Sequence, residues 1–386
     1  MMAAVSPPSA QEHASGLEKY LEEGVERARA IGNRGPLELD SNGKLQQKIL
    51  DAFLEHGFYV FEGVIDTGEL EELRADIERL LDEAPTGKDS KVDAKGRPAF
   101  GQAFARPTYT FIKPLSDPWG GTKLLSGRHQ VQMTQPSPAE DAPDEVVHLI
   151  GGMCQTMESG LRLYGHPSLL AIAEAINGPD FVPFNDATFV KLPGLGGSVA
   201  WHQDGVTHWD APDWDPGIHG FNFQVQLYPS TPANCLWVVP GSHKQGRADI
   251  KALVAENDGS EYLPDAVPLT CNAGDVTIAN RQIVHCSFAN SSPDTRISLT
   301  FGFHRRTSVI GQRGVLGQED DSVYDEQRVF ERSRVIAVAI DARQQHFPGE
   351  RRFVYQPFAG HEDEYRWSPE MYERVIKNYN LQDLSI

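Results

Sequence analysis

Apolar positions follow two spacings along the chain, first that of helices and later that of strands. Apolar residues recur every three to four positions over 45–54 and again over 67–81, on either side of the short apolar run 58–61. These spacings predict a helix, a strand and a second helix. Residues 1–44 are polar and predict a loose arm with one short helix.

Short apolar segments separated by Gly, Pro, Asn and Asp make up the chain from about residue 181. They span 188–192, 198–201, 221–228, 236–239, 275–279, 283–288 and 297–303. Many short strands with turn signals between them are typical of a sandwich or barrel. We therefore predict a mainly β protein with flanking helices and a double-stranded β-helix core, a cupin-like jelly roll. The sequence has no strand–helix alternation and no glycine-rich phosphate motif, which disfavours a nucleotide-binding fold.

The predicted organisation is a single domain over 45–305, with the jelly-roll core at about 181–305. Residues 306–386 are expected to form a C-terminal flank packed on that core, and they contain a strand-like apolar run at 335–340. Residues 86–145 are rich in Gly, Pro, Lys and Asp and predict long loops that frame a site.

Composition narrows the classes of function. The 386 residues include 35 basic and 54 acidic side chains, a net charge of −19, which disfavours nucleic acid and anionic membranes as partners. The four cysteines form no C-x-x-C pair, and the N-terminus lacks the pattern of a secretory signal, so we expect a cytoplasmic protein. The sequence gives no indication of the oligomeric state.

The first candidate for a metal site is a histidine and an aspartate two positions apart. About one such pair is expected by chance in a chain with this many histidines, so the spacing alone carries no weight. The chain has three of them, His202/Asp204, His208/Asp210 and His361/Asp363. Only His202 follows an apolar strand-like run and precedes a glycine, which places it at the end of a β element. The other two pairs lie in polar, turn-rich segments, where solvated loops are the simpler interpretation.

A third metal ligand would complete a facial triad of two histidines and one carboxylate, the site of non-haem iron oxygenases. His285 is the candidate, because it lies 83 residues after His202 on another apolar run. Farther on, Arg296 and Ser298 would share one strand face, where a guanidinium can hold a carboxylate. From the residues alone, a buried structural His285 and a surface salt bridge at Arg296 remain alternatives.

The order of these segments resembles the phytanoyl-CoA dioxygenase-like family of Fe(II)- and 2-oxoglutarate-dependent oxygenases. The segments that carry the resemblance are EHGFYVFEGV (55–64), KLPG (191–194), WHQD (201–204), NCLWVVPGSH (234–243) and GDV (274–276), followed by His285, Arg296 and Ser298. The similarity covers roughly 45–83 and 160–305. This chain departs from the family pattern where Asn234 runs directly into Cys235.

The resemblance implies iron at His202, Asp204 and His285, and 2-oxoglutarate held by Arg296 and Ser298. It also implies a reaction with O2 that oxidises a small-molecule substrate, most simply by hydroxylation, and releases succinate and CO2. The carboxylate of Asp204 disfavours halogenation, because related halogenases lack it. Substrate identity, and the choice between hydroxylation, desaturation, epoxidation and rearrangement, stay open.

Gln224, His243 and Cys286 are further residues of interest. The strand 221–228 alternates apolar and amide side chains, so its amide face is either solvent-exposed or lines the site, and Gln224 is the candidate for a contact with 2-oxoglutarate or substrate. His243 in a turn and Cys286 facing away from the metal are expected to be structural. Two other functions remain as alternatives, a non-catalytic metal-binding jelly roll and a cupin-type metal enzyme that does not use 2-oxoglutarate.

Overall fold

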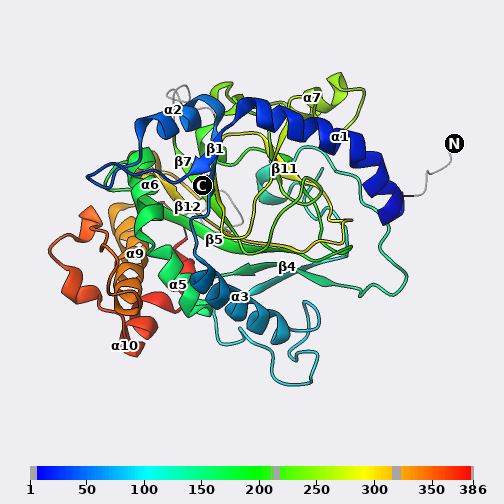
Figure 1. Ribbon diagram of the computed structural model, residues 1–386. Helices are drawn as coiled ribbons and strands as arrows, with labels where there is room; N and C mark the ends of the chain where they lie inside the picture. Colours follow the sequence, from blue (N-terminus) through cyan, green and yellow to red (C-terminus); the bar gives the residue numbers. More distant parts are fainter. Residues whose placement is uncertain (1–6, 210, 212–217, 315–322, 384–386) are drawn as a thin grey trace.

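The computed structural model describes residues 7–209, 211, 218–314 and 323–383. Its centre is a pair of facing β-sheets (Figure 1). The larger sheet has the strand order β1-β2-β10-β7-β12-β5-β4-β3 and the smaller one β6-β11-β8-β9. The predicted jelly-roll core is thus confirmed.

The strands of the larger sheet are β1 (Arg34–Pro36), β2 (Phe58–Glu62), β3 (Tyr109–Ile112), β4 (Val146–Gly151), β5 (Val182–Lys191), β7 (Gly220–Gln226), β10 (Val276–Asn280) and β12 (Arg296–His304). Those of the smaller sheet are β6 (Val199–His202), β8 (Leu236–Val238), β9 (Val267–Leu269) and β11 (His285–Ser287). Apart from the parallel pair β1 and β2, neighbouring strands are antiparallel. Strands β1 to β4 come from residues before 181–305, the predicted extent of the core. The predicted division of the chain into arm, domain and flank stays a prediction.

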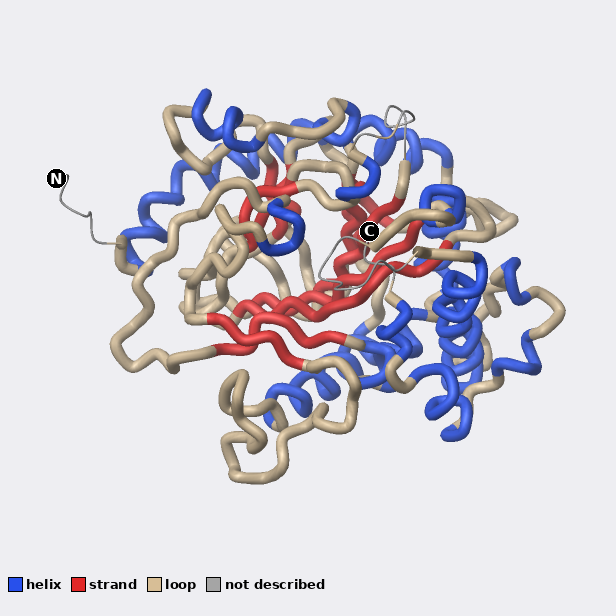
Figure 2. The backbone as a smooth tube through the Cα atoms, turned by 180° about the vertical axis from the view of Figure 1, so that it is seen from behind, coloured by secondary structure: helices blue, strands red, loops and turns tan. Residues whose placement is uncertain are grey.

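Helices cover the outer face of the larger sheet, and the first helix packs on the smaller sheet, so the inner faces are left for the site (Figures 1 and 2). The helices are α1 (Ala10–Ile31), α2 (Gln47–His56), α3 (Thr67–Asp82), α4 (Met153–Thr156), α5 (Glu158–Tyr164), α6 (Pro167–Asn177), α7 (Ile250–Glu256), α8 (Arg306–Val309), α9 (Glu326–His346) and α10 (Pro369–Met371). None of the helices in the described part of the chain is long and apolar enough to cross a membrane.

The predicted helix–strand–helix opening is confirmed as α2, β2 and α3. Helix α2 ends where Gly57 adopts a φ of 81°, and a Cβ at that position would meet the ring of His243 at 2.5 Å. Helix α3 begins at Asp66, whose side chain accepts a hydrogen bond from the backbone N–H of Glu69.

Two sequence predictions are wrong. The apolar run 335–340 is the buried middle of helix α9, not a strand, because six consecutive apolar residues carry no periodicity that separates the two structures. The N-terminal segment is packed rather than loose. Helix α1 spans 22 residues, begins with a capping box between Ser9 and Glu12, and stacks Tyr20 on Trp237 of β8 at 4.7 Å.

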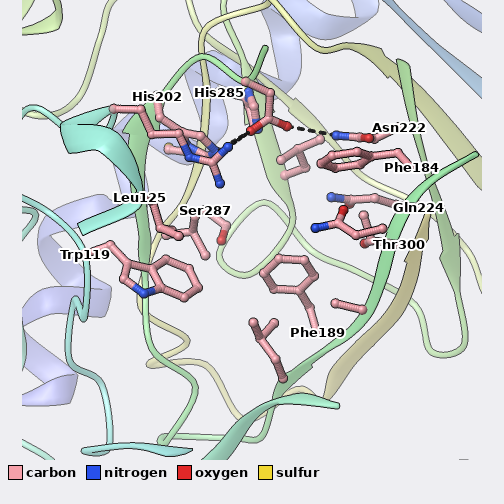
Figure 3. Close-up of a pocket in the computed structure, with 18 of the residues that line it drawn as sticks. Trp119, Leu125, Phe184, Phe189, His202, Asn222, Gln224, His285, Ser287 and Thr300 are labelled. Carbon is pink, nitrogen blue, oxygen red and sulfur yellow. Dashed lines mark hydrogen bonds and ion pairs between the residues drawn. The ribbon is translucent and has the colours of Figure 1, made fainter. Parts of the chain in front are cut away.

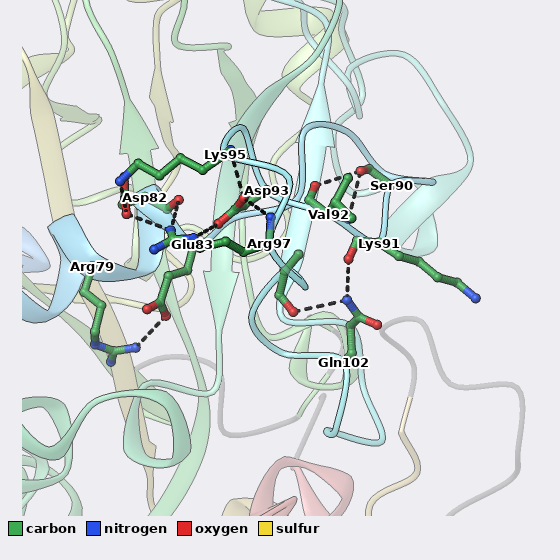
Figure 4. A network of polar contacts seen from close by, with 11 residues as sticks. Arg79, Asp82, Glu83, Ser90, Lys91, Val92, Asp93, Lys95, Arg97 and Gln102 are labelled. Atoms are coloured by element: carbon green, nitrogen blue, oxygen red, sulfur yellow. Dashed lines mark hydrogen bonds and ion pairs between the residues drawn. The ribbon is translucent and has the colours of Figure 1, made fainter.

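The first part of the 86–145 region is anchored by polar contacts at the end of α3 (Figure 4). The carboxylate of Asp93 accepts hydrogen bonds from the backbone N–H groups of Lys95 and Arg97, each at 2.9 Å. Arg97 also pairs with Asp82 of α3 at 2.9 Å. This stretch therefore braces the helix, and only later residues of the region reach the site.

The docking of α1 can be tested with two glycines of the same helix. A Cβ at Gly24 would lie 2.3 Å from the Trp237 ring, whereas nothing lies within 4 Å of a Cβ at Gly16. We expect Gly24→Ala to lower the free energy of unfolding by about 1–3 kcal/mol through overpacking. Gly16→Ala should raise it by about 0.5–1 kcal/mol through helix propensity. Urea denaturation measures both, and equal effects of the two substitutions would contradict the docked helix.

Candidate active site

His202 and His285 lie directly opposite each other on neighbouring strands. They are a register pair of β6 and β11, and their ring centroids are 4.0 Å apart. Nδ1 of His202 lies 2.8 Å from the carbonyl oxygen of Ala200, and Nδ1 of His285 lies 2.9 Å from that of Ile283. Because a carbonyl oxygen only accepts, each Nδ1 carries the proton and each Nε2 presents a lone pair.

Asp204 supplies a carboxylate at the same point. Its Oδ1 lies 3.6 Å from His202 Nε2, and one ligand atom from each of Asp204, His202 and His285 lies within 4.8 Å of the others. Strand β6 ends at His202, so strand alternation does not aim this carboxylate. The backbone N–H of Asp204 instead donates to the carbonyl of Arg281 at 2.7 Å, which fixes the turn after the strand.

Two polar side chains hold the carboxylate of Asp204 in place (Figure 3). Asn222 Nδ2 donates to Oδ2 at 2.9 Å, and the guanidinium of Arg128 forms an ion pair with Oδ1. Such outer partners set the orientation of a ligand side chain. Asn222 comes from β7 and Arg128 from the loop after β3, so both sheets and a loop meet at this carboxylate.

The charge states of the three side chains fit a divalent metal. Burial raises the pKa of Asp204, but the charges of Arg128 and Arg281 and the neighbouring histidines together outweigh it and bring the pKa to about 2. Burial lowers the pKa of both His202 and His285, so both imidazoles are neutral at pH 7. Two neutral imidazoles and one carboxylate are the donor set that suits Fe(II) and leaves coordination positions open.

These residues border one cavity of about 240 Å³ between the two sheets. Its wall is mixed in character, with apolar side chains facing the polar ones across the space (Figure 3). The apolar part of the lining includes Trp119, Leu125, Leu149, Phe184 and Phe189. The cavity is partly open to solvent, and apolar side chains make up much of its lining.

Arg296 of β12 lies in the wall of the same cavity and is 2% exposed. It donates to Gln224 Oε1 at 2.8 Å, while its Nε has no hydrogen-bond partner among the described residues. No described carboxylate forms an ion pair with it. A buried guanidinium without a counter-charge is costly, so the arrangement fits an anionic ligand such as the far carboxylate of 2-oxoglutarate.

Ser298 and Lys191 lie beside Arg296. Ser298 is on the same face of β12 and fully buried, and its hydroxyl has no partner among the described residues, although it does not border the cavity. Lys191 is the register partner of Arg296 on β5 and donates to the carbonyl of Phe288 at 2.6 Å. Burial, and then the charge of Arg296, lowers the pKa of Lys191 well below its usual value.

The other sequence candidates lie elsewhere or are structural in character. His208 stacks on His219 at 4.2 Å and bonds the carbonyl of Ser308, while Asp210 lies outside the described residues. His361 is exposed and pairs with Glu364. His243 Nε2 bonds the carbonyl of Leu54 at 3.0 Å.

Cys286 is buried among apolar side chains as expected, although it also borders the cavity. In the C-terminal flank, Arg306 pairs with Glu326 on the surface.

Sequence reasoning missed Arg128 and Asn222. Asn222 is on the amide face of the strand that contains Gln224, so the alternation could have found it, and this amide face does line the site. Arg128 stands in a loop segment without periodicity, and no sequence signal marks it.

Comparisons with known proteins agree with this geometry. A family model described as phytanoyl-CoA dioxygenase (PhyH) matches residues 53–298. Phytanoyl-CoA dioxygenase 1 of Oryza sativa subsp. japonica is 33% identical over 117 residues, which are 28% of this chain and 40% of that one. Phytanoyl-CoA dioxygenase of Arabidopsis thaliana is 24% identical over 262 residues, 66% of this chain and 87% of that one.

The fold has a counterpart among solved structures. EctD from S. alaskensis, crystallised with 2-oxoglutarate and 5-hydroxyectoine, superposes with a TM-score of 0.50 at 18% identity, over 75% of this chain and 87% of that chain. Fold and cavity together define a jelly-roll oxygenase of the non-haem iron type. The chain belongs to the phytanoyl-CoA dioxygenase family, whose model spans most of its length. It is a dioxygenase that depends on non-haem iron and 2-oxoglutarate, as the resemblance implied.

If His202, Asp204 and His285 hold the metal, substitutions at a ligand, at a residue that orients a ligand and at a histidine elsewhere should weaken Fe(II) binding to different extents. We expect His285→Ala to weaken Fe(II) binding by more than about 100-fold, and Asn222→Ala by about 10-fold because it only orients Asp204. His361→Ala is the matched control and should bind Fe(II) like the wild type. Anaerobic Fe(II) titration measures all three, and a loss of binding in the control would contradict the assignment.

Proposed function

We propose that the protein oxidises a small-molecule substrate, most simply by hydroxylation, at an iron held by His202, Asp204 and His285. The observation that carries the proposal is that these three side chains border the same cavity as Arg296, which has no acidic partner among the described residues. When bound, Fe(II) and 2-oxoglutarate together reduce O2, with release of succinate and CO2 and transfer of one oxygen atom to the substrate.

The protein's own residues prepare this reaction. The carbonyls of Ala200 and Ile283 hold the two imidazoles with Nε2 directed at the metal position. Arg296, with Gln224 beside it, would bind the far carboxylate of 2-oxoglutarate and so fix the direction in which the co-substrate enters. The apolar wall excludes water and lowers the local dielectric constant, which strengthens each of these contacts.

We also propose that the protein is cytoplasmic. All four cysteines are buried and unpaired, which is what a reducing cytoplasm would favour.

A role in binding 2-oxoglutarate is also proposed for Ser298. It would donate its hydroxyl hydrogen to the same carboxylate that Arg296 holds, because its Oγ is otherwise unpartnered among the described residues.

The main test is reconstitution with Fe(II) under anaerobic conditions, followed by addition of O2 and 2-oxoglutarate with candidate substrates. We expect succinate from the wild type and a loss of at least about 1000-fold in His202→Ala, because the metal chemistry needs that ligand. Succinate that is undiminished in His202→Ala, or absent from the wild type with every substrate mixture, would refute the proposal. A metal-binding protein without catalysis, or an enzyme that does not use 2-oxoglutarate, would give the second result.

Substitution of Arg296 should affect the binding of 2-oxoglutarate more than the rate of the chemical step. A charge-assisted pair contributes about 1.5–3 kcal/mol, so Arg296→Gln should raise the KM for 2-oxoglutarate by about 10–100-fold. The kcat at saturating 2-oxoglutarate should change much less, and Arg296→Lys should recover part of the affinity. A fall in kcat with an unchanged KM would exclude Arg296 as the anchor.

A further inference from the structure

Arg128 is a second cation in the cavity wall with incomplete hydrogen bonding. Its side chain is 14% exposed, and the guanidinium pairs with Asp204. Its Nε is buried and has no partner among the described residues. A guanidinium offers five N–H donors, so one carboxylate oxygen leaves most of this capacity unused in a confined space. The side chain needs a further acceptor when the cavity is filled.

The loop that presents Arg128 is built to hold a fixed position. The backbone N–H of Gly121 donates to the carbonyl of His129 at 2.9 Å and closes the base of the loop. Buried Asp117 accepts hydrogen bonds from the backbone of Gly120 at 2.9 Å and of Met133 at 2.8 Å.

Between these anchors the loop has a strained tip. Leu125 and Ser126 adopt positive φ angles of 49° and 59°, which L residues rarely adopt, and Leu125 borders the cavity. Strain that surrounding contacts maintain is a frequent feature of ligand-binding segments. The loop therefore keeps Leu125 and Arg128 at the cavity.

The charges in the cavity indicate what the missing acceptor is. Of the described residues that line it, Arg128 and Arg296 are cationic and Asp204 is anionic, which leaves one positive charge. Fe(II) and the 2-oxoglutarate dianion cancel each other. Since unbalanced charge in a partly buried site is costly, a single negative charge on the substrate would balance the charges of these lining residues.

We propose that Arg128 binds the carboxylate of a small, otherwise apolar monocarboxylate substrate. This inference rests on the proposed function and names the substrate class for the same site. A phosphate monoester fits less well, because it carries about 1.5–2 negative charges at pH 7. The cavity of about 240 Å³ must also hold 2-oxoglutarate, so the substrate is small, and Trp119, Leu125 and Phe184 offer its body an apolar wall.

The test is equilibrium binding without turnover. The full-length protein is loaded with Mn(II) and 2-oxoglutarate under anaerobic conditions and titrated calorimetrically with straight-chain acids of four to eight carbons and phenylacetate. Each acid is matched with its primary amide, and phenylphosphonate is the dianionic probe. We expect the best carboxylate to bind about 10–100-fold more tightly than its amide, as a charge-assisted pair requires.

Variants assign this preference to Arg128. Arg128→Gln should abolish the difference between acid and amide, and Arg128→Lys should keep part of it. Arg162→Gln is the matched control, since that side chain is also 14% exposed and ion-paired, with Glu72, outside the cavity. Because Arg128 also pairs with Asp204, Arg128→Gln is expected to weaken metal binding, so this variant is titrated at Mn(II) and 2-oxoglutarate concentrations that saturate it, and acid is compared with amide within the same variant.

Three results would overturn the inference. The first is an amide that binds as tightly as its acid, the second is a preference for acids that survives in Arg128→Gln, and the third is tighter binding of phenylphosphonate than of phenylacetate. If no carboxylate binds although the wild type binds 2-oxoglutarate and forms succinate, the substrate class is wrong and the proposed function stands. If the wild type neither binds 2-oxoglutarate nor forms succinate, the proposed function itself fails.

Discussion

The antiparallel pairing of β6 with β11 is the interaction on which the site depends. It sets His202 opposite His285, and a slip of one residue would turn one imidazole to the other face of the sheet. The neighbouring positions prevent such a slip, because Trp201 and Cys286 are buried in the apolar cluster behind the two strands. The geometry of the proposed metal site is therefore determined in part by side chains that would not touch the metal.

Burial gives each charge in the cavity a larger effect than it would have at the surface. Arg128, together with Arg281 and nearby histidines, keeps Asp204 ionised against the cost of burial, while Arg296 has no acid beside it among the described residues. The charges of Arg128 and Asp204 thus balance each other at one end of the cavity. The charge of Arg296 at the other end is left to be balanced by a bound anion. In a water-filled cleft solvent would screen both cations, and neither would discriminate strongly between ligands.

Much of the architecture follows from local sequence patterns, and the exceptions have physical reasons. The spacing over 45–81 and the short alternating segments after residue 181 indicate the opening elements and the jelly roll correctly. The run 335–340 was wrongly predicted to be a strand, because a fully apolar stretch shows neither the spacing of a helix nor that of a strand. His202, Asp204 and His285 could be selected because two of them end or begin apolar strands, whereas Arg128 could not, since its place is set by a loop without periodicity that is closed through Asp117 and backbone hydrogen bonds. Which side of β7 faces the site likewise depends on the sheet that packs against it.

Helix α1 has a consequence for the order of folding. Tyr20 donates to the carbonyl of Leu263 and Arg27 to that of Ala266, each through a side chain that emerges from the ribosome more than 200 residues before its partner. During synthesis the helix has no surface to dock on until β8, β9 and the segment between them are complete. Its apolar side must stay unpaired through most of translation, and closing so long a loop is a slow, late event. The N-terminal helix, although made first, thus cannot reach these native contacts until the chain has been synthesised past Ala266.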